Sequence, residues 1–142
     1  MLNILIADDS RSMRELLVHY LKPQGHVDIA VNGVEAVDLF KRSVETGPRY
    51  DLVLLDVMMP EMDGLEAARH INDMQADLDE RSRIMVLSCL DDMEHITKAH
   101  YEVGVEVYLT KPFDLSNLLE AMANLGLIEQ PDLGDDISGE DD

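Results

Sequence analysis

The chain has 142 residues, 46% of them hydrophobic, which is typical of one globular domain and argues against a wholly disordered chain. The formal net charge of −19 at pH 7 would repel phosphate backbones, so direct binding of DNA or RNA is not expected. A single cysteine, Cys89, excludes an internal disulfide, and no run approaches the ~20 apolar residues that span a bilayer, so we expect a soluble, cytoplasmic protein.

The first half of the chain alternates short apolar runs with longer amphipathic ones. Residues 3–7 (NILIA) are nearly continuously apolar, as expected of a strand that is buried on both faces. A helix follows, in which Ser12 and Glu15 form the pattern of a capping box. Residues 27–31 are a weaker strand candidate, and a second helix is predicted to start near Gly33.

The same alternation continues through the middle of the chain. Residues 51–55 (DLVLL) and 83–87 (RIMVL) are predicted to be buried strands, and a helix that begins around Gly64 separates them. A fourth helix is predicted from about residue 91 to residue 103 and is expected to end at Gly104.

The last elements are a weak strand at 106–109 and a helix with Asp114 as its N-cap. The order strand–helix then occurs five times, which predicts an α/β fold with a parallel sheet between two layers of helices. Residues 126–142 contain seven acidic and no basic residues, together with Pro and Gly and without periodicity. The sequence therefore predicts one domain over 1–125, with a net charge of −12, and an acidic flexible tail over 126–142.

Polar residues follow or end the predicted strands. Asp8 and Asp9 follow the first strand, Asp56 the third, Ser88 the fourth and Lys111 the fifth. All carboxyl ends of an open parallel sheet lie at one edge, where such folds bind ligands, so these side chains are expected to converge.

Three carboxylates in one pocket repel one another, by about 4 kcal/mol for each pair 4 Å apart at an effective dielectric of 20. Either their pKa values rise or a cation binds between them. A site of oxygen ligands with open coordination positions suits Mg²⁺. A carboxylate between a metal ion and the Lys111 ammonium can act as a nucleophile toward phosphorus, because both cations offset charge on the transferring group.

The set Asp8-Asp9, LLDVMMPEMDG at 54–64, Ser88, Tyr108 and Lys111-Pro112 resembles the response-regulator receiver domain of two-component systems, in its chemotaxis-regulator-like form without an attached output domain. The resemblance covers roughly residues 2–125. It implies a flavodoxin-like (βα)5 three-layer sandwich with the five-stranded parallel sheet in the order 2-1-3-4-5, for which the chemotaxis member is a standard example.

The resemblance also implies the role of each residue in the acidic pocket. Asp56 would be the phosphoacceptor, and it would hold Mg²⁺ together with Asp9 and the backbone carbonyl of Met58. Asp8 would act through the metal, partly by way of water. Lys111 would pair with the phosphoryl group and with Asp56, aimed into the pocket by a cis bond to Pro112.

Ser88 and Tyr108 would form the family's switch. The Ser88 hydroxyl would move to a phosphoryl oxygen, and the Tyr108 ring would fill the space that it leaves. The readout surface would be the fourth helix, the fifth strand and the fifth helix. The implied partners are a histidine kinase or phosphotransfer protein and a downstream protein, with no nucleic acid and no membrane insertion; the chain would catalyse only its own phosphorylation and dephosphorylation.

Other readings of the pattern remain open. Within the family, the chain would serve as an output protein, a partner-regulating receiver or an intermediate in a phosphorelay. An aspartyl phosphohydrolase would carry a second Asp two residues after its nucleophile, whereas Asp8 is followed by Asp9 and Ser10. A flavin or nucleotide module would need a glycine- or hydroxyl-rich phosphate loop after the first strand. The intact acidic set disfavours a degenerate scaffold. The histidines are expected to be surface or packing residues, and Cys89 a small buried one.

Overall fold

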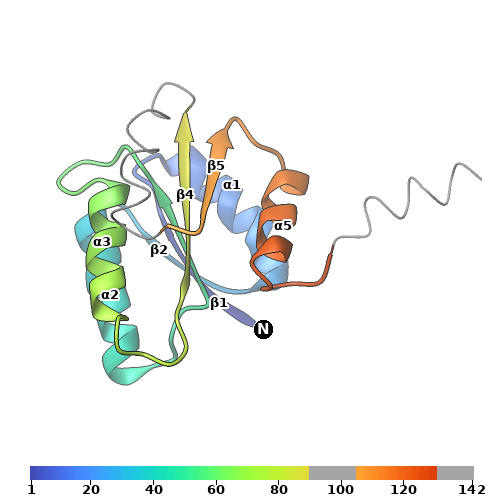
Figure 1. Ribbon diagram of the computed structural model, residues 1–142. Coiled ribbons are helices and arrows are strands. Elements are labelled where there is room, and N and C mark those ends of the chain that lie inside the picture. The colour runs from blue at the N-terminus through green and yellow to red at the C-terminus, as the bar shows by residue number, and fades with distance from the viewer. Residues whose placement is uncertain (90–104, 131–142) are drawn as a thin grey trace, which may run out of the picture.

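The computed structural model describes residues 1–89 and 105–130. Strands and helices alternate along these residues, as the apolar and amphipathic runs predict (Figure 1). The strands are β1 (Leu2–Ala7), β2 (Gly25–Ala30), β3 (Leu52–Asp56), β4 (Arg83–Cys89) and β5 (Val107–Lys111). The helices are α1 (Arg11–Leu21), a 3₁₀ turn (Lys22–Gln24), α2 (Gly33–Thr46), α3 (Gly64–Met74) and α5 (Leu115–Asn124). The helix predicted at 91–103 lies outside the described residues.

All five strands are parallel and lie in the order β2-β1-β3-β4-β5. The chain moves outward from β1 in one direction to β2 and then crosses back to build β3, β4 and β5 on the other side. This arrangement confirms the predicted flavodoxin-like fold and its strand order. It also brings the carboxyl ends of β1 and β3 together, at the point where ligands bind in open α/β sheets.

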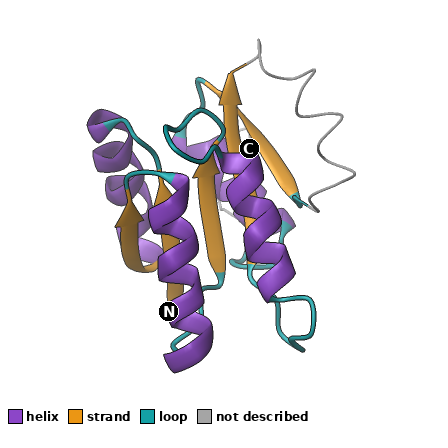
Figure 2. Ribbon diagram, turned by 90° about the vertical axis from the view of Figure 1, so that its left-hand side faces the viewer, coloured by secondary structure: helices purple, strands orange, loops and turns teal. Residues whose placement is uncertain are grey.

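The sheet is covered on both faces, which explains why its central strands lack the polar alternation of a half-exposed strand. Leu5 and Ala7 of β1 pack in one core under α2 and α3, and Ile4 and Ile6 pack in the other under α1 and α5. Figures 1 and 2 show the two helical layers on opposite sides of the strands. Each fully buried Leu or Ile stabilises the fold by about 1.5–3 kcal/mol.

The helices begin at side-chain caps, which satisfy backbone N–H groups of the first turn. Asp114 caps α5 as predicted, and Asn32 caps α2 directly before Gly33. The predicted cap of α1 is wrong: its N-cap is Ser10, whose hydroxyl accepts a hydrogen bond from the Met13 N–H, and the helix starts earlier than expected.

Residues beyond α5 continue to pack against the domain. The Leu127 N–H donates to the Met122 carbonyl oxygen at 3.0 Å, and Leu127 and Ile128 lie against the core beneath α1 and α5. The packed residues thus extend past the boundary predicted at 125, and the tail from residue 131 lies outside the described residues. No helix in the described part of the chain combines the length and the apolar character that crossing a membrane requires.

Candidate functional site

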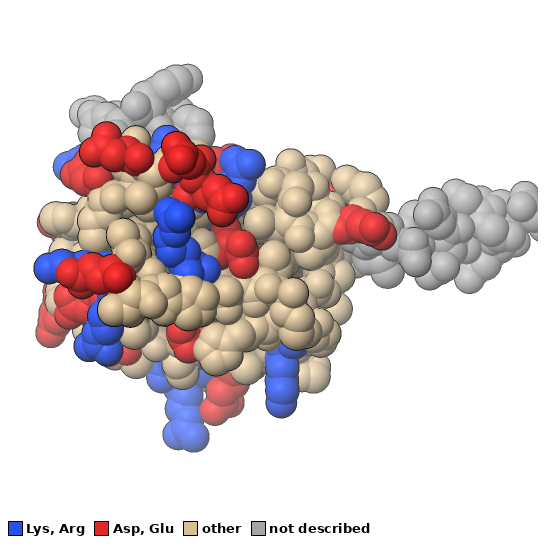
Figure 3. All heavy atoms as spheres, turned by 90° about the horizontal axis from the view of Figure 1, so that it is seen from below, with Lys and Arg blue, Asp and Glu red and all other residues tan. Residues whose placement is uncertain are grey.

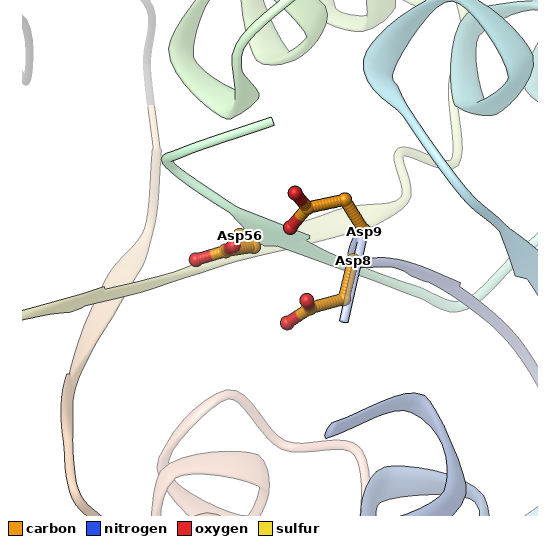
Figure 4. Close-up of side chains that lie close together, drawn as sticks. All are labelled: Asp8, Asp9 and Asp56. Carbon is orange, nitrogen blue, oxygen red and sulfur yellow. The ribbon is translucent and has the colours of Figure 1, made fainter. Parts of the chain in front are cut away.

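The polar residues of the strand ends meet at the carboxyl edge of the sheet. Asp8 and Asp9 directly follow β1, and Asp56 is the last residue of β3. Figure 4 shows the three carboxylates directed into one space, although Asp56 lies almost fifty positions from the other two. The chain therefore forms the acidic cluster that the strand pattern predicts.

The three acids differ in their surroundings. One carboxylate oxygen from each lies within 4.8 Å of one from each of the other two. Asp8 is fully buried and Asp56 is 6% exposed, whereas Asp9 is exposed. Asp8 Oδ1 accepts a hydrogen bond from the Ser10 N–H at 2.8 Å, but Asp8 Oδ2 is buried and has no hydrogen-bond partner among the described residues. A buried carboxylate oxygen without a donor is costly, so a bound cation would satisfy it.

Lys111 brings a positive charge to the acidic cluster. Its Nζ lies 2.8 Å from Asp56 Oδ1 and 3.6 Å from Asp8 Oδ2, so one ammonium group contacts carboxylates from two strands. The Lys111–Pro112 bond is cis, as the resemblance implies. Three carboxylates against one ammonium leave a formal charge of −2 in the cluster, which is the charge that a divalent cation would neutralise.

The charges and the burial of the pocket shift the pKa values of Asp56 and Lys111. Burial raises the pKa of Asp56, the hydrogen bond from Lys111 opposes this rise, and the charge of Asp8 adds to it. Burial alone would lower the pKa of Lys111, but its hydrogen bond to Asp56 and the neighbouring carboxylates raise it above its ordinary value. Lys111 is therefore held in its charged form, whereas burial and the neighbouring carboxylate charges disfavour the charged form of Asp56.

The loop after β3 is built closely onto the acidic residues. Gly64 donates its N–H to the Val57 carbonyl at 3.0 Å, and a Cβ atom at Gly64 would overlap the Asp56 carbonyl oxygen. Met58 belongs to this loop and is 63% exposed. Its backbone carbonyl remains the predicted metal ligand.

The two predicted switch residues lie on adjacent strands. Ser88 is 2% exposed, and its hydroxyl donates to the Cys89 carbonyl at 3.0 Å. Tyr108 pairs with Val86 in the sheet register, is partly buried, and packs against the core under α2 and α3. Burial raises the pKa of Tyr108. Cys89, the final residue of β4, was expected to be buried but is exposed.

Sequence reasoning missed one contact at this site. Arg14, the fourth residue of α1, donates from Nη1 to the backbone carbonyl of Asp8 at 2.8 Å. A basic residue near the start of a helix carries no signal of this kind, because the contact depends on how α1 turns away from β1.

The opposite edge of the sheet has a different character. Figure 3 shows the molecule from that side, and acidic and basic side chains are interspersed there across an otherwise uncharged surface. The cluster of three acids and Lys111 lies at the carboxyl edge, which is the edge with ligand-binding geometry.

Comparison with known proteins agrees with this geometry. A family model described as the response regulator receiver domain matches residues 4–123. Response regulator MprA of Mycobacterium sp. (strain KMS) is 40% identical over 134 residues, which are 94% of this chain and 54% of that protein. The chain thus spans about half the length of the curated relatives it matches.

Two solved structures show the same similarity in three dimensions. The chemotaxis protein CheY4 of Vibrio cholerae is 28% identical, with a TM-score of 0.74 over 87% of this chain and 98% of that one. CheY in the CheX–CheY–BeF3–Mg²⁺ complex of Borrelia burgdorferi is 28% identical, with a TM-score of 0.75 over 88% of this chain and 89% of that one.

The fold and the site define a doubly wound α/β signalling module with an acidic pocket at its switch point, rather than an enzyme that acts on an external substrate. The chain belongs to the response regulator receiver family of two-component signalling.

Proposed function

We propose that this chain accepts a phosphoryl group on Asp56 from a phosphohistidine of a histidine kinase or phosphotransfer protein, and changes a partner-binding surface in response. The observation that carries the proposal is the convergence of three carboxylates and Lys111 at the switch point of the sheet. We place this activity in the cytoplasm.

The residues of the pocket fit Mg²⁺. Asp8, Asp9 and Asp56 supply oxygen ligands, and the buried Oδ2 of Asp8 accepts no hydrogen bond among the described residues. The Met58 carbonyl, on the loop that follows Asp56, would add a further oxygen. A relative with this fold has been solved as a complex with Mg²⁺, which supports the choice of metal. When bound, Mg²⁺ offsets charge on the transferring phosphoryl group.

Asp56 performs the chemistry in this proposal. One of its carboxylate oxygens forms the new P–O bond as the P–N bond of the phosphohistidine breaks, and the imidazole nitrogen leaves with the electron pair. Lys111, already 2.8 Å from Asp56 Oδ1, stabilises negative charge on the equatorial phosphoryl oxygens as it develops. The protein contributes mainly position and charge balance. Hydrolysis of the acyl phosphate in the same pocket returns Asp56 to its carboxylate form.

The response arises from Ser88 and Tyr108. A phosphoryl group on Asp56 offers the Ser88 hydroxyl a charged acceptor in place of the Cys89 carbonyl, and the Tyr108 ring moves into the vacated space. The changed surface comprises the segment at 91–103 that is predicted to be the fourth helix, together with β5 and α5, and a downstream protein binds there. The CheX–CheY complex of Borrelia burgdorferi supports binding of a protein partner by a domain of this fold. Passing the phosphate onward in a relay is the second candidate role.

Intact-mass analysis after incubation with acetyl phosphate tests the proposal. The wild-type protein should gain one phosphoryl group with Mg²⁺ and none with EDTA, and Asp56→Asn should gain none in either case. Asp38→Asn, which removes an exposed acid of α2, is the matched control and should be phosphorylated normally. A wild-type protein without phosphate under these conditions would refute the proposal. Steady turnover of a phosphomonoester would instead indicate the phosphohydrolase.

Ser88→Ala tests the switch separately. This variant should be phosphorylated at Asp56 but should bind the phosphorylation-dependent partner more weakly, because the hydroxyl that responds to phosphate is absent. An undiminished response in Ser88→Ala would contradict the coupling and leave phosphorylation itself unaffected.

A further inference from the structure

The backbone around Asp8 is held at three points. The Asp8 N–H donates to the Ala30 carbonyl at 3.2 Å, which ties the residue to β2. The Ser10 N–H donates to Asp8 Oδ1 at 2.8 Å, so the side chain also closes the turn into α1. The third point is the Asp8 carbonyl oxygen, which accepts from Arg14 Nη1 at 2.8 Å. These contacts leave Oδ2 as the atom of Asp8 that faces the acidic pocket and Lys111.

We propose that Arg14 is a positioning residue for the metal site, acting through the peptide group that joins Asp8 to Asp9. This inference rests on the proposed function, because it assumes that the acidic pocket binds Mg²⁺. The Asp8 carbonyl belongs to the peptide plane from which Asp9 extends, so the hydrogen bond from Arg14 fixes the orientation of two acids at once. Asp9 is exposed and no core packing holds it, which makes this restraint important for its carboxylate.

The location of Arg14 suits the role. Its backbone lies in the first turns of α1, where its N–H donates to the Ser10 carbonyl at 3.0 Å, so the base of the side chain is fixed. The guanidinium is partly buried, and a hydrogen bond from a charged donor contributes more there than at an exposed position. Arg14 therefore connects a rigid helix to the turn that carries the ligands.

The same guanidinium also places a positive charge behind an acidic cluster, so its hydrogen bond and its charge need to be separated. Arg11 provides the matched control. It lies on the same helix, lines the same shallow cavity of about 310 Å³ between α1 and β2, and pairs with Glu15 at 3.1 Å instead of with the backbone of Asp8. Arg11→Ala removes an equal charge from the same region and leaves the Asp8 carbonyl contact intact.

Isothermal titration calorimetry of the metal-free protein with MgCl₂ tests the inference without depending on phosphorylation. Arg14→Ala should bind Mg²⁺ about tenfold more weakly than wild type, the loss typical when a group that orients metal ligands is removed. Arg14→Lys retains both a donor and the positive charge, and Arg14→Gln retains a donor without the charge. Both variants should recover part of the affinity, because the hydrogen bond is what positions the acids. Arg11→Ala should bind within about twofold of wild type.

A second readout separates positioning from general damage. In acetyl phosphate reactions, Arg14→Ala should require about tenfold more Mg²⁺ for half-maximal phosphorylation, with a similar rate at saturation. Circular dichroism in EDTA identifies variants that fold, and if Arg14→Ala does not, Arg14→Lys and Arg14→Gln carry the comparison. Equal affinity in wild type and in folded Arg14 variants, or an equal loss in Arg11→Ala, would overturn the inference. A wild-type protein that binds no Mg²⁺ would instead overturn the proposed function.

Discussion

Asp9→Asn should stabilise the metal-free protein while abolishing its stabilisation by Mg²⁺. The reason is that Asp9 lies within 4.8 Å of carboxylate oxygens of Asp8 and Asp56, and no ion pair between Asp9 and Lys111 is present among the described residues. Removing the Asp9 charge therefore relieves repulsion and sacrifices little attraction. Asparagine has nearly the same shape, so the packing of the turn should be retained.

The magnitude follows from Coulomb's law. A like-charge pair at 4.8 Å costs about 0.9 kcal/mol at the dielectric constant of water and about 3.5 kcal/mol at an effective value of 20. Because Asp9 is exposed, the lower figure applies, and its two pairs give a gain of about 1–2 kcal/mol. For a domain of this size, that gain corresponds to a rise in Tm of about 3–6 °C.

Magnesium should reverse the order of the two proteins. At a Mg²⁺ concentration 100 times its Kd, the wild type would gain about 2.7 kcal/mol, more than Asp9→Asn gains from the lost repulsion. The Tm of each protein is measured by circular dichroism in EDTA and across a MgCl₂ titration. Plotted against Mg²⁺ concentration, the Tm of wild type should start below that of Asp9→Asn and rise above it. Asp38→Asn, which removes an exposed acid far from the cluster in sequence, should change neither the Tm in EDTA nor the response of the Tm to Mg²⁺. An Asp9→Asn variant that melts no higher than wild type in EDTA, or that still responds fully to Mg²⁺, would refute the reasoning.

Three further predictions concern other parts of the domain. Tyr50→Phe should cost about 1.5–3 kcal/mol in urea unfolding, because Tyr50 is a buried residue whose hydroxyl donates to the Asp28 carboxylate at 2.7 Å. Since burial raises the pKa of Tyr50, wild-type stability should also fall above pH ~10, as pH rises from the unfolded pKa through the folded one, and Tyr50→Phe should lack this component. Gly64→Ala should destabilise the protein by about 1–3 kcal/mol in the same assay, because its Cβ would overlap the Asp56 carbonyl. Met58→Asn should shorten the lifetime of the phosphorylated protein several-fold in a mass-resolved decay, because a polar side chain there can orient the attacking water.

The central strands and their order could be predicted from the sequence because burial on both faces leaves a strong apolar signal. The runs at 51–55 and 83–87 fall within one or two residues of β3 and β4. The edge strand β2 was placed later than it begins, since Gly25 and His26 at its start are not apolar. An edge strand pairs on one side only, and its exposed positions accept polar residues, which weakens the pattern.

The cap of α1 shows why local motifs can mislead. Ser12 and Glu15 have the spacing of a capping box, but Glu15 pairs with Arg11 and the cap is Ser10. Ser10 becomes the cap because its N–H donates to the Asp8 carboxylate, and this hydrogen bond fixes the turn at that position. The requirements of the acidic pocket therefore decide where the helix starts.

The site could be predicted as a set of residues but not as a set of contacts. The edge rule for parallel sheets brings Asp8, Asp56 and Lys111 together whatever the details of packing. It does not say that Asp8 is fully buried while Asp9 is exposed, or that Arg14 reaches the Asp8 carbonyl. Those properties depend on the direction in which the chain leaves β1, which no periodic pattern records.

The charge balance of the pocket limits how strong the switch can be. A bound divalent cation neutralises the formal charge of −2. Phosphorylation then replaces the carboxylate charge of Asp56 with a phosphoryl charge of about −1.5 to −2, so the pocket gains about −0.5 to −1 and needs new donors. Ser88 would exchange a neutral acceptor, the Cys89 carbonyl, for a charged one, which improves its hydrogen bond by about 1 kcal/mol. That difference shifts a two-state equilibrium only about fivefold. Ser88→Ala should therefore weaken partner binding by about this factor rather than abolish it. A much larger loss in an equilibrium binding assay would show that the Ser88 hydroxyl contributes more than one improved hydrogen bond to the phosphoryl group.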